Sequence, residues 1–332
     1  MKQLLTLIFI FVIIQLNAQD GHFSQFYASP MSLNPALTGL SNYKLKATAQ
    51  YRQQWKSVTV PYISTQGGVE GRFNSGYNNA IGAGISFVNN EAGNANFTNP
   101  QVYLTGAFHK GLDDEGSSFI SVGGQFGAAQ RSINSSLSFN SQYDGSIFNI
   151  NLPSGEVIDN QQVSYIEGSV GVAYSLIKDE QTSAYIGLAM FHINRPNISF
   201  VRNTKDPLER KLTFYAGGSF PLNDQFSLIL QGVILNQGPF NETNIGAMVR
   251  YNLIKSYYDN GGEVALTVGT IHRFNDAQIF VGRLDYKTIS LGLSYDYNFS
   301  SLTPASSSRG AYELSLVFQF GDIERGRGCP VF

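Results

Sequence analysis

The chain has 332 residues, a formal net charge of −2 and 14% charged residues, whereas soluble domains carry about 25%. The charge balance gives no case for nucleic-acid binding, which needs a basic patch, and a single cysteine excludes an internal disulfide. The 34 glycines, 24 phenylalanines and 18 tyrosines fit a wall with small side chains on one face and lipid on the other.

The first segment is typical of a secretory signal peptide. Lys2 supplies the positive start, residues 4–16 are apolar, and Ala18 precedes Gln19, so we expect cleavage after Ala18. As a membrane-anchor helix this run is too short to cross about 30 Å of hydrocarbon, and no later window reaches the length of a membrane helix. The mature chain is therefore expected to leave the cytoplasm.

Residues 19–42 are expected to form an irregular arm, because Pro30, Pro35 and Gly39 interrupt any regular element. Phe23, Phe26 and other apolar side chains in this arm are costly to leave in water, so the arm must pack against something. Two interpretations remain open. The arm closes the bottom of the barrel described next, or it enters the lumen as a plug or gate.

Residues 43–320 contain about fourteen stretches in which apolar and small or polar side chains alternate. In residues 288–297 (TISLGLSYDY), Ile289, Leu291 and Leu293 share one face, and this period of two indicates a strand. A soluble sandwich gives the same alternation, but so many repeats without a long helical stretch favour one closed antiparallel outer-membrane β-barrel, an all-β fold of about 14 strands. The predicted strands are residues 43–51, 64–72, 80–89, 101–109, 119–130, 163–176, 183–193, 211–220, 226–235, 243–251, 263–272, 277–286, 288–297 and 312–320.

Loop lengths favour one orientation of this barrel. With the N-terminus in the periplasm, most of the long loops face outward and most of the short turns face the periplasm, as in known outer-membrane barrels. The largest loop, residues 131–162, holds Phe139, Tyr143 and Phe148, and we expect it to cap the barrel mouth or to contact a partner. Residues 321–332 are expected to form a periplasmic tail.

No catalytic constellation is evident, so neither an enzyme nor a cofactor is expected. The four histidines lack metal-ligand spacing, and no nucleophile elbow stands at a strand-to-helix junction. A terminal Cys329-Pro330-Val331-Phe332 formally matches a prenylation box, but a secreted protein does not meet the cytosolic enzymes that read it. Polar residues expected on the lumen faces are Gln50, Glu70, Gln125, Glu167, Gln231, Arg250, Asp296 and Gln319.

Both ends of the mature chain contain sequence motifs that a barrel fold alone does not require. The sequence contains His22-Phe23-Ser24-Gln25-Phe26-Tyr27, Leu33-Asn34-Pro35-Ala36 and Tyr51-Arg52-Gln53-Gln54-Trp55, and it ends in Cys329-Pro330-Val331-Phe332. These motifs resemble the PorP/SprF family of the Bacteroidetes type IX secretion system. The resemblance implies an outer-membrane protein that docks and helps to export or anchor large surface adhesin or gliding proteins through their C-terminal sorting domains, beside periplasmic ring components of that system.

The motif positions give the candidate partner-binding or plug residues. A fourteen-stranded barrel would not pass a folded adhesin, so we expect a docking component and not the main pore. Five of these residues, Phe23, Phe26, Tyr51, Arg52 and Trp55, are the expected core of the docking surface; alternatively they only seal the barrel bottom and the first outer loop. The full set is His22, Phe23, Gln25, Phe26, Tyr27, Asn34, Pro35, Tyr51, Arg52, Trp55 and Cys329.

Two rival functions stay open. One is a passive outer-membrane transporter of small hydrophobic molecules with an N-terminal plug. The other is an outer-membrane lipase or protease, for which His109, His192 or His272 would supply one member of a catalytic group, although no nucleophile stands out.

Overall fold

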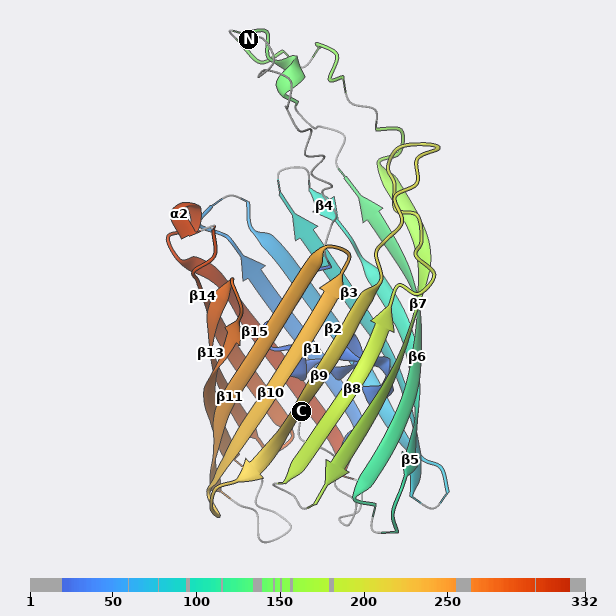
Figure 1. Ribbon diagram of the computed structural model, residues 1–332, viewed down its shortest axis with the longest axis vertical. Coiled ribbons are helices and arrows are strands. Elements are labelled where there is room, and N and C mark those ends of the chain that lie inside the picture. The colour runs from blue at the N-terminus through green and yellow to red at the C-terminus, as the bar shows by residue number, and fades with distance from the viewer. Residues whose placement is uncertain are drawn as a thin grey trace, which may run out of the picture.

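A computed structural model describes residues 20–322 except 59, 77, 94–95, 115, 134–138, 146, 150, 156–157, 179–181, 255–263 and 302. Fourteen long antiparallel strands close into a barrel (Figure 1), which confirms the predicted fold class. A two-residue strand, β4 (Phe97–Thr98), pairs with β3 and β6. The long strands are β1 (Tyr43–Gln54), β2 (Tyr62–Asn74), β3 (Asn79–Ala92), β5 (Gln101–Gly111), β6 (Ser118–Ser132), β7 (Gln162–Ile177), β8 (Ser183–Phe191), β9 (Lys211–Pro221), β10 (Phe226–Gln237), β11 (Phe240–Ile254), β12 (Val264–Arg273), β13 (Ala277–Tyr286), β14 (Ile289–Asn298) and β15 (Arg309–Asp322).

The first and last strands close the sheet. β1 pairs with β15 from Leu45 opposite Phe320 to Gln54 opposite Ala311, so the barrel has no free edge that would need covering. Along each strand, apolar side chains face outward and their neighbours face the lumen. On β14, for example, Leu293 is 58% exposed on the lipid face.

The two ends of the barrel differ. The described parts of segment 133–161 and segment 192–210 project from one end, at the top of Figure 1, and tight turns such as residues 222–225 connect the strands at the other. We call these the long-loop end and the short-turn end. In the described part of the largest loop, η3 (Asn140–Gln142) lies well above the rim and not across the mouth (Figure 1).

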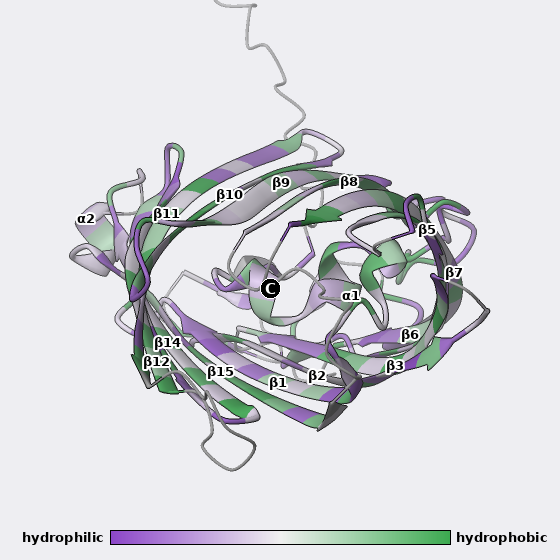
Figure 2. Ribbon diagram, turned by 90° about the horizontal axis from the view of Figure 1, so that it is seen from below, coloured by the Kyte–Doolittle hydropathy of each residue, from purple (hydrophilic) through white to green (hydrophobic). Residues whose placement is uncertain are grey.

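The arm, Asp20–Asn42, lies inside the ring of strands, as the position of α1 in Figure 2 shows. It contains three short helical segments, η1 (Phe26–Ala28), α1 (Pro30–Leu33) and η2 (Pro35–Leu37), joined by irregular stretches. Pro30 and Pro35 do not break these helices because each stands at the first helical position, where its missing N–H is not needed.

The arm enters the described part of the chain near the long-loop end. The Asp20 amide donates to Gln237 at the end of β10 (3.0 Å), and the chain then descends to β1 at the short-turn end. The first described residues of the arm therefore lie near the long-loop end, and its last residues lie at the short-turn end. Among the described residues, no helix is long and apolar enough to cross a membrane.

Candidate functional site

The first part of the arm is held by a buried ion cluster, which we define as Arg52, Glu242, Arg273, Asp296 and Glu313. These five side chains come from β1, β11, β12, β14 and β15 and converge on the lumen because each occupies an inward-facing strand position. Arg52 lies 2.8 Å from an Asp296 carboxylate oxygen and 3.3 Å from a Glu313 oxygen, and it is only 1% exposed.

The ion cluster binds two consecutive arm residues. The backbone amides of Ser24 and Gln25 donate to the two Glu313 carboxylate oxygens at 2.7 and 2.9 Å. The Ser24 hydroxyl accepts from Arg52 and Arg273 and donates to Asp296 at 3.0 Å. A guanidinium presents a rigid fork of donors that suits such paired contacts with carboxylates.

The Gln25 side chain and carbonyl extend these contacts along β1 and β15. The Ser315 hydroxyl donates to the Gln25 amide oxygen at 2.7 Å, and the Gln50 amide donates to the Gln25 carbonyl at 3.0 Å. His22 lies 3.3 Å from Glu242, beside the same ion cluster. The lumen thus recognises the arm through its backbone and through particular side chains.

A second polar group holds the start of the arm, and we call it the latch: Asp20, Glu167, His192 and Lys211. An Asp20 carboxylate oxygen lies 2.7 Å from His192 Nε2 and 3.1 Å from Lys211 Nζ, while His192 Nδ1 contacts Glu167. Backbone strain accompanies this placement, because His192 has φ of 55°, a conformation that non-glycine residues rarely adopt. The strain is consistent with His192 being held in place by its two carboxylate partners.

The latch shifts the pKa values of two of its members, His192 and Asp20. Burial lowers the pKa of His192, but the Asp20 and Glu167 carboxylates more than compensate and raise it to about 9. Burial raises the pKa of Asp20, but His192 and Lys211 bring it well below its usual value. At neutral pH the contact is therefore an ion pair.

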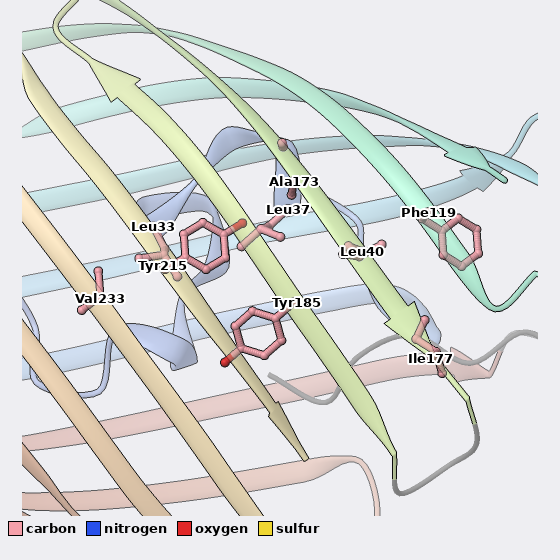
Figure 3. Close-up of a cluster of buried hydrophobic side chains, with 10 residues drawn as sticks. Leu33, Leu37, Leu40, Phe119, Ala173, Ile177, Tyr185, Tyr215 and Val233 are labelled. Carbon is pink, nitrogen blue, oxygen red and sulfur yellow. The ribbon is translucent and has the colours of Figure 1, made fainter. Parts of the chain in front are cut away.

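The second part of the arm is held by close packing. The arm's Leu33, Leu37 and Leu40 join an apolar cluster with Tyr215 and Phe119 of the wall (Figure 3). Strand glycines make room for the backbone. A Cβ at Gly82 would lie 1.8 Å from the Thr38 carbonyl oxygen, and one at Gly123 would lie 2.5 Å from the Pro35 carbonyl oxygen.

Asn34 fixes the turn between α1 and η2. Its side-chain oxygen accepts from the Ala36 amide at 2.8 Å, and its amide nitrogen donates to the Val172 carbonyl at 3.0 Å and to the Tyr215 hydroxyl at 3.1 Å. Asn34 is fully buried. The same nitrogen also lies 3.3 Å from the Leu188 carbonyl oxygen, so a helix cap and three wall contacts depend on one side chain.

A cavity that opens to solvent lies between the arm and the long-loop end, and together with the solvent space at its mouth it measures about 1040 Å³. Phe23 and Phe26 of the arm form part of its floor, and Gln237 and Phe240 line it beside the β10–β11 turn. Its walls are mostly apolar, with several amide side chains among them.

The five residues expected to form one docking surface do not lie together. Arg52 is buried in the lumen and Phe23 and Phe26 line the cavity, but Tyr51 and Trp55 are 37% and 36% exposed. Strand alternation explains the split between Tyr51 and Arg52, because consecutive residues point to opposite faces. The chain leaves β1 at Trp55 with φ of 55°, and the Trp55 amide donates to the Gly310 carbonyl at 3.0 Å.

The other candidates fall into three places. His22 and Gln25 contact lumen side chains, and Pro35 packs against the wall at Gly123. Tyr27 is buried in an apolar cluster with residues of β11, β12 and β13. Cys329 lies outside the described residues. Sequence reasoning placed Asp296 and Glu167 on the lumen face but did not connect them to the arm, and it missed Glu313, Arg273 and the latch lysine.

Across the described residues, no group of three or more His, Cys, Asp or Glu side chains is arranged to hold a metal ion. The polar clusters described above are mutually paired acids and bases. What this arrangement provides chemically is the binding of a polypeptide segment inside a barrel.

Comparison with known proteins decides the family. A family model described as "Type IX secretion system membrane protein PorP/SprF" matches residues 15–318. The chain belongs to this family. Together with the closed barrel, membership of the PorP/SprF family places the chain in the outer membrane. No curated protein matches the chain.

Solved structures similar to this PorP/SprF chain are outer-membrane barrels. The toluene transporter TbuX of Ralstonia pickettii has a TM-score of 0.51 at 13% identity, with 88% of this chain and 94% of that chain covered. A FadL homologue of Pseudomonas aeruginosa has a TM-score of 0.47 at 10% identity, with 86% and 93% covered. At these identities the likeness to TbuX concerns the fold alone.

Proposed function

We propose that this protein docks large exported surface proteins at the outer membrane and helps to export or anchor them, without being the pore through which they pass. Family membership supports a role in type IX secretion. The arm is the feature that favours docking of exported proteins over their passage through the lumen. Ser24 binds β1, β12, β14 and β15, while Asn34 binds β7, β8 and β9 about halfway around the sheet. A folded adhesin would not pass a barrel that is bridged in this way.

The long-loop end is the proposed docking face. Tyr143, Ile147 and Phe148 on the largest loop are 55%, 65% and 46% exposed, beyond the barrel rim. The loop is supported by the neighbouring segment, since the Asn160 amide donates to the Phe200 carbonyl at 3.0 Å. Large exposed apolar side chains on a supported loop suit a protein partner, which we propose to be the C-terminal sorting domain of an adhesin or gliding protein.

The short-turn end faces the periplasm in this proposal. There the protein would contact periplasmic ring components of the secretion system, which agrees with the expected placement of the tail after residue 320. The proposal also includes removal of the signal peptide after Ala18, which mass measurement of the purified mature protein would test.

Surface display tests the docking role. Replacing Phe23, Phe26 and Trp55 with Ala should abolish display of the exported adhesin while the barrel still assembles and shows heat-dependent gel mobility. Because the structure separates these residues, Phe23→Ala/Phe26→Ala and Trp55→Ala are also made apart, with lipid-facing Phe214→Ala as the control. Normal display in both separate variants and in the triple variant would reject the assignment.

A second candidate is passive transport of small hydrophobic molecules. The apolar lining of the cavity favours it, and TbuX of similar fold is a toluene transporter. Liposomes containing the purified protein would then take up toluene without any secretion partner. Uptake equal to that of protein-free liposomes would exclude this candidate.

A further inference from the structure

The cavity above the arm has a lining that suits one class of ligand. Six amide side chains contribute to its walls. Its three basic side chains already have acidic partners: His192 and Lys211 are paired with Asp20 in the latch, and His22 lies beside Glu242. The amides are Gln66, Asn90, Gln101, Gln125, Gln237 and Asn244.

Three side chains of the lining each hold a buried oxygen without a hydrogen-bond partner. These atoms are Oε1 of Gln125, Oγ1 of Thr213 and Oδ1 of Asn244, and all three residues are more than nine-tenths buried. An unpaired buried acceptor costs about 1–3 kcal/mol. A ligand that supplies N–H donors would recover part of this free energy once these side chains turn toward it.

The apolar part of the lining combines four phenylalanines with the aliphatic side chains of Leu33, Val88, Val233 and Leu235. Phe23, Phe26, Phe191 and Phe240 contribute to the walls, and Phe240 is 37% exposed beside the β10–β11 turn. A ligand for these walls has an apolar side chain as well as N–H donors. A hydrocarbon would leave the three unpaired oxygens without partners, whereas a ligand with N–H donors would pair with them.

The same lumen already binds one polypeptide in this manner. Glu313 accepts from two consecutive arm amides, and the Gln50 amide donates to an arm carbonyl at 3.0 Å. Amide side chains that can donate and accept are suited to a peptide backbone, whose N–H and C=O groups alternate along the chain.

We propose that this cavity is a binding site for an extended, uncharged polypeptide segment with an apolar side chain, inserted from the long-loop end above the arm. The inference rests on the proposed function in one respect, because it takes the segment to belong to the exported partner. It adds a second peptide site to the lumen, with the arm as its floor.

Site-specific photo-cross-linking in cells that secrete the natural partners tests the site. Phe191→p-benzoylphenylalanine and Phe240→p-benzoylphenylalanine place the probe in the cavity, and Phe214→p-benzoylphenylalanine places it on the lipid face. Both cavity positions should cross-link to one short polypeptide segment, identified by mass spectrometry. The lipid-facing position should not cross-link to that segment.

A matched pair of substitutions makes the result specific. Gln125→Leu should lower the yield of the cross-linked polypeptide about tenfold, because it removes an amide from the cavity. Gln231→Leu alters an amide beneath the arm and should leave this cross-linking yield unchanged. The mapped segment, made as a synthetic peptide, should bind the purified protein in calorimetry and bind Gln125→Leu about tenfold more weakly.

Several outcomes would overturn the inference. These are adducts with only lipid or glycan, no adduct at either cavity position, a polypeptide yield that Gln125→Leu leaves unchanged, and a synthetic peptide that does not bind. Failure of the proposed function gives a different result. The peptide would bind the purified protein, but surface display of the adhesin would be normal in the Phe23, Phe26 and Trp55 variants.

Discussion

The two halves of the arm are held in different ways. In the first half, Asp20–Tyr27, most contacts are hydrogen bonds and ion pairs with the latch and the ion cluster. In the second half, Ala28–Leu40, leucines pack into an apolar cluster and the backbone lies directly on strand glycines. Hydrogen bonds and ion pairs can be exchanged for water or for another polar partner, whereas close packing depends on shape.

This difference assigns two roles. The second half continues directly into β1, so it anchors the arm to the wall. The first half lines the cavity together with Ser29, Ser32 and Leu33 of the second half, and its binding depends on groups whose charge can be changed. The predictions below separate these roles, beginning with the substitution of largest expected effect.

The largest effect is expected at Arg52. Arg52→Leu leaves the Asp296 and Glu313 carboxylates buried with Arg273 as the remaining cation of the ion cluster, and breaking such a buried pair costs about 3–5 kcal/mol. Denaturant unfolding in detergent micelles measures the loss of stability. Arg309→Leu is the control, because Arg309 is exposed at the same end of the barrel. Equal effects of the two substitutions would contradict the role of the ion cluster.

The next effect tests the packed half. Gly82→Ala introduces a Cβ 1.8 Å from the Thr38 carbonyl oxygen, and overpacking of this kind costs about 1–3 kcal/mol. The second half should move from the wall, which protease cleavage of the arm would detect. Gly282→Ala is the control, since a Cβ there meets nothing within 4 Å. An arm that stays protected in Gly82→Ala would show that packing does not anchor it.

A smaller and more local effect is expected at Asn34. Asn34→Ala removes the cap of η2 and its contact with Tyr215, at a cost of about 0.5–2 kcal/mol for the cap. Hydrogen exchange at the amides of residues 36–40 should become faster, while exchange at Ser24 and Gln25 changes little. Equal acceleration in both halves would mean that the arm opens as one unit.

The smallest effect is expected from pH. The pKa of His192 is raised from 6.5 to about 9, so its contribution to stability is complete below about 6.5 and is lost as the pH rises through about 9. The pKa of Asp20 is lowered, so its contribution is lost only in acid. Between pH 7 and pH 10, amide protection near Asp20, corrected for intrinsic exchange, should fall.

His192→Gln is the control for this titration. It should show weaker protection of the same amides at pH 7 and no further fall on titration to pH 10. A fall in this variant as large as in the natural protein would assign the pH dependence to another group.

The sequence predicted the wall well because each strand carries its own signal. Alternation places Leu291 toward lipid and Ser290 toward the lumen without reference to any other strand. The sequence also indicated Arg52 as a candidate site residue. Strand alternation alone predicts that its side chain and that of Tyr51 point to opposite faces of the sheet. The helices of the arm were missed because Pro30 and Pro35 were taken as breakers and not as first helical residues.

The partners of the arm could not be predicted in the same way. Arg52 and Asp296 are far apart in the sequence, and they meet only because β1 pairs with β15 and β15 pairs with β14. His192 and Asp20 likewise meet only when the arm lies in the lumen. Local patterns identify inward-facing polar residues, but the closed sheet decides which of them face one another.

The position of Ser24 and Gln25 has a consequence for biogenesis. Both residues are bound at once by β1 and by β15, the strands whose pairing closes the sheet. We therefore expect the pairing of β1 with β15 and the docking of the arm in the lumen to occur in one concerted step of membrane insertion. A chain from which the arm is deleted would have to pair β1 with β15 while Arg52 and Glu313 face a lumen without the arm.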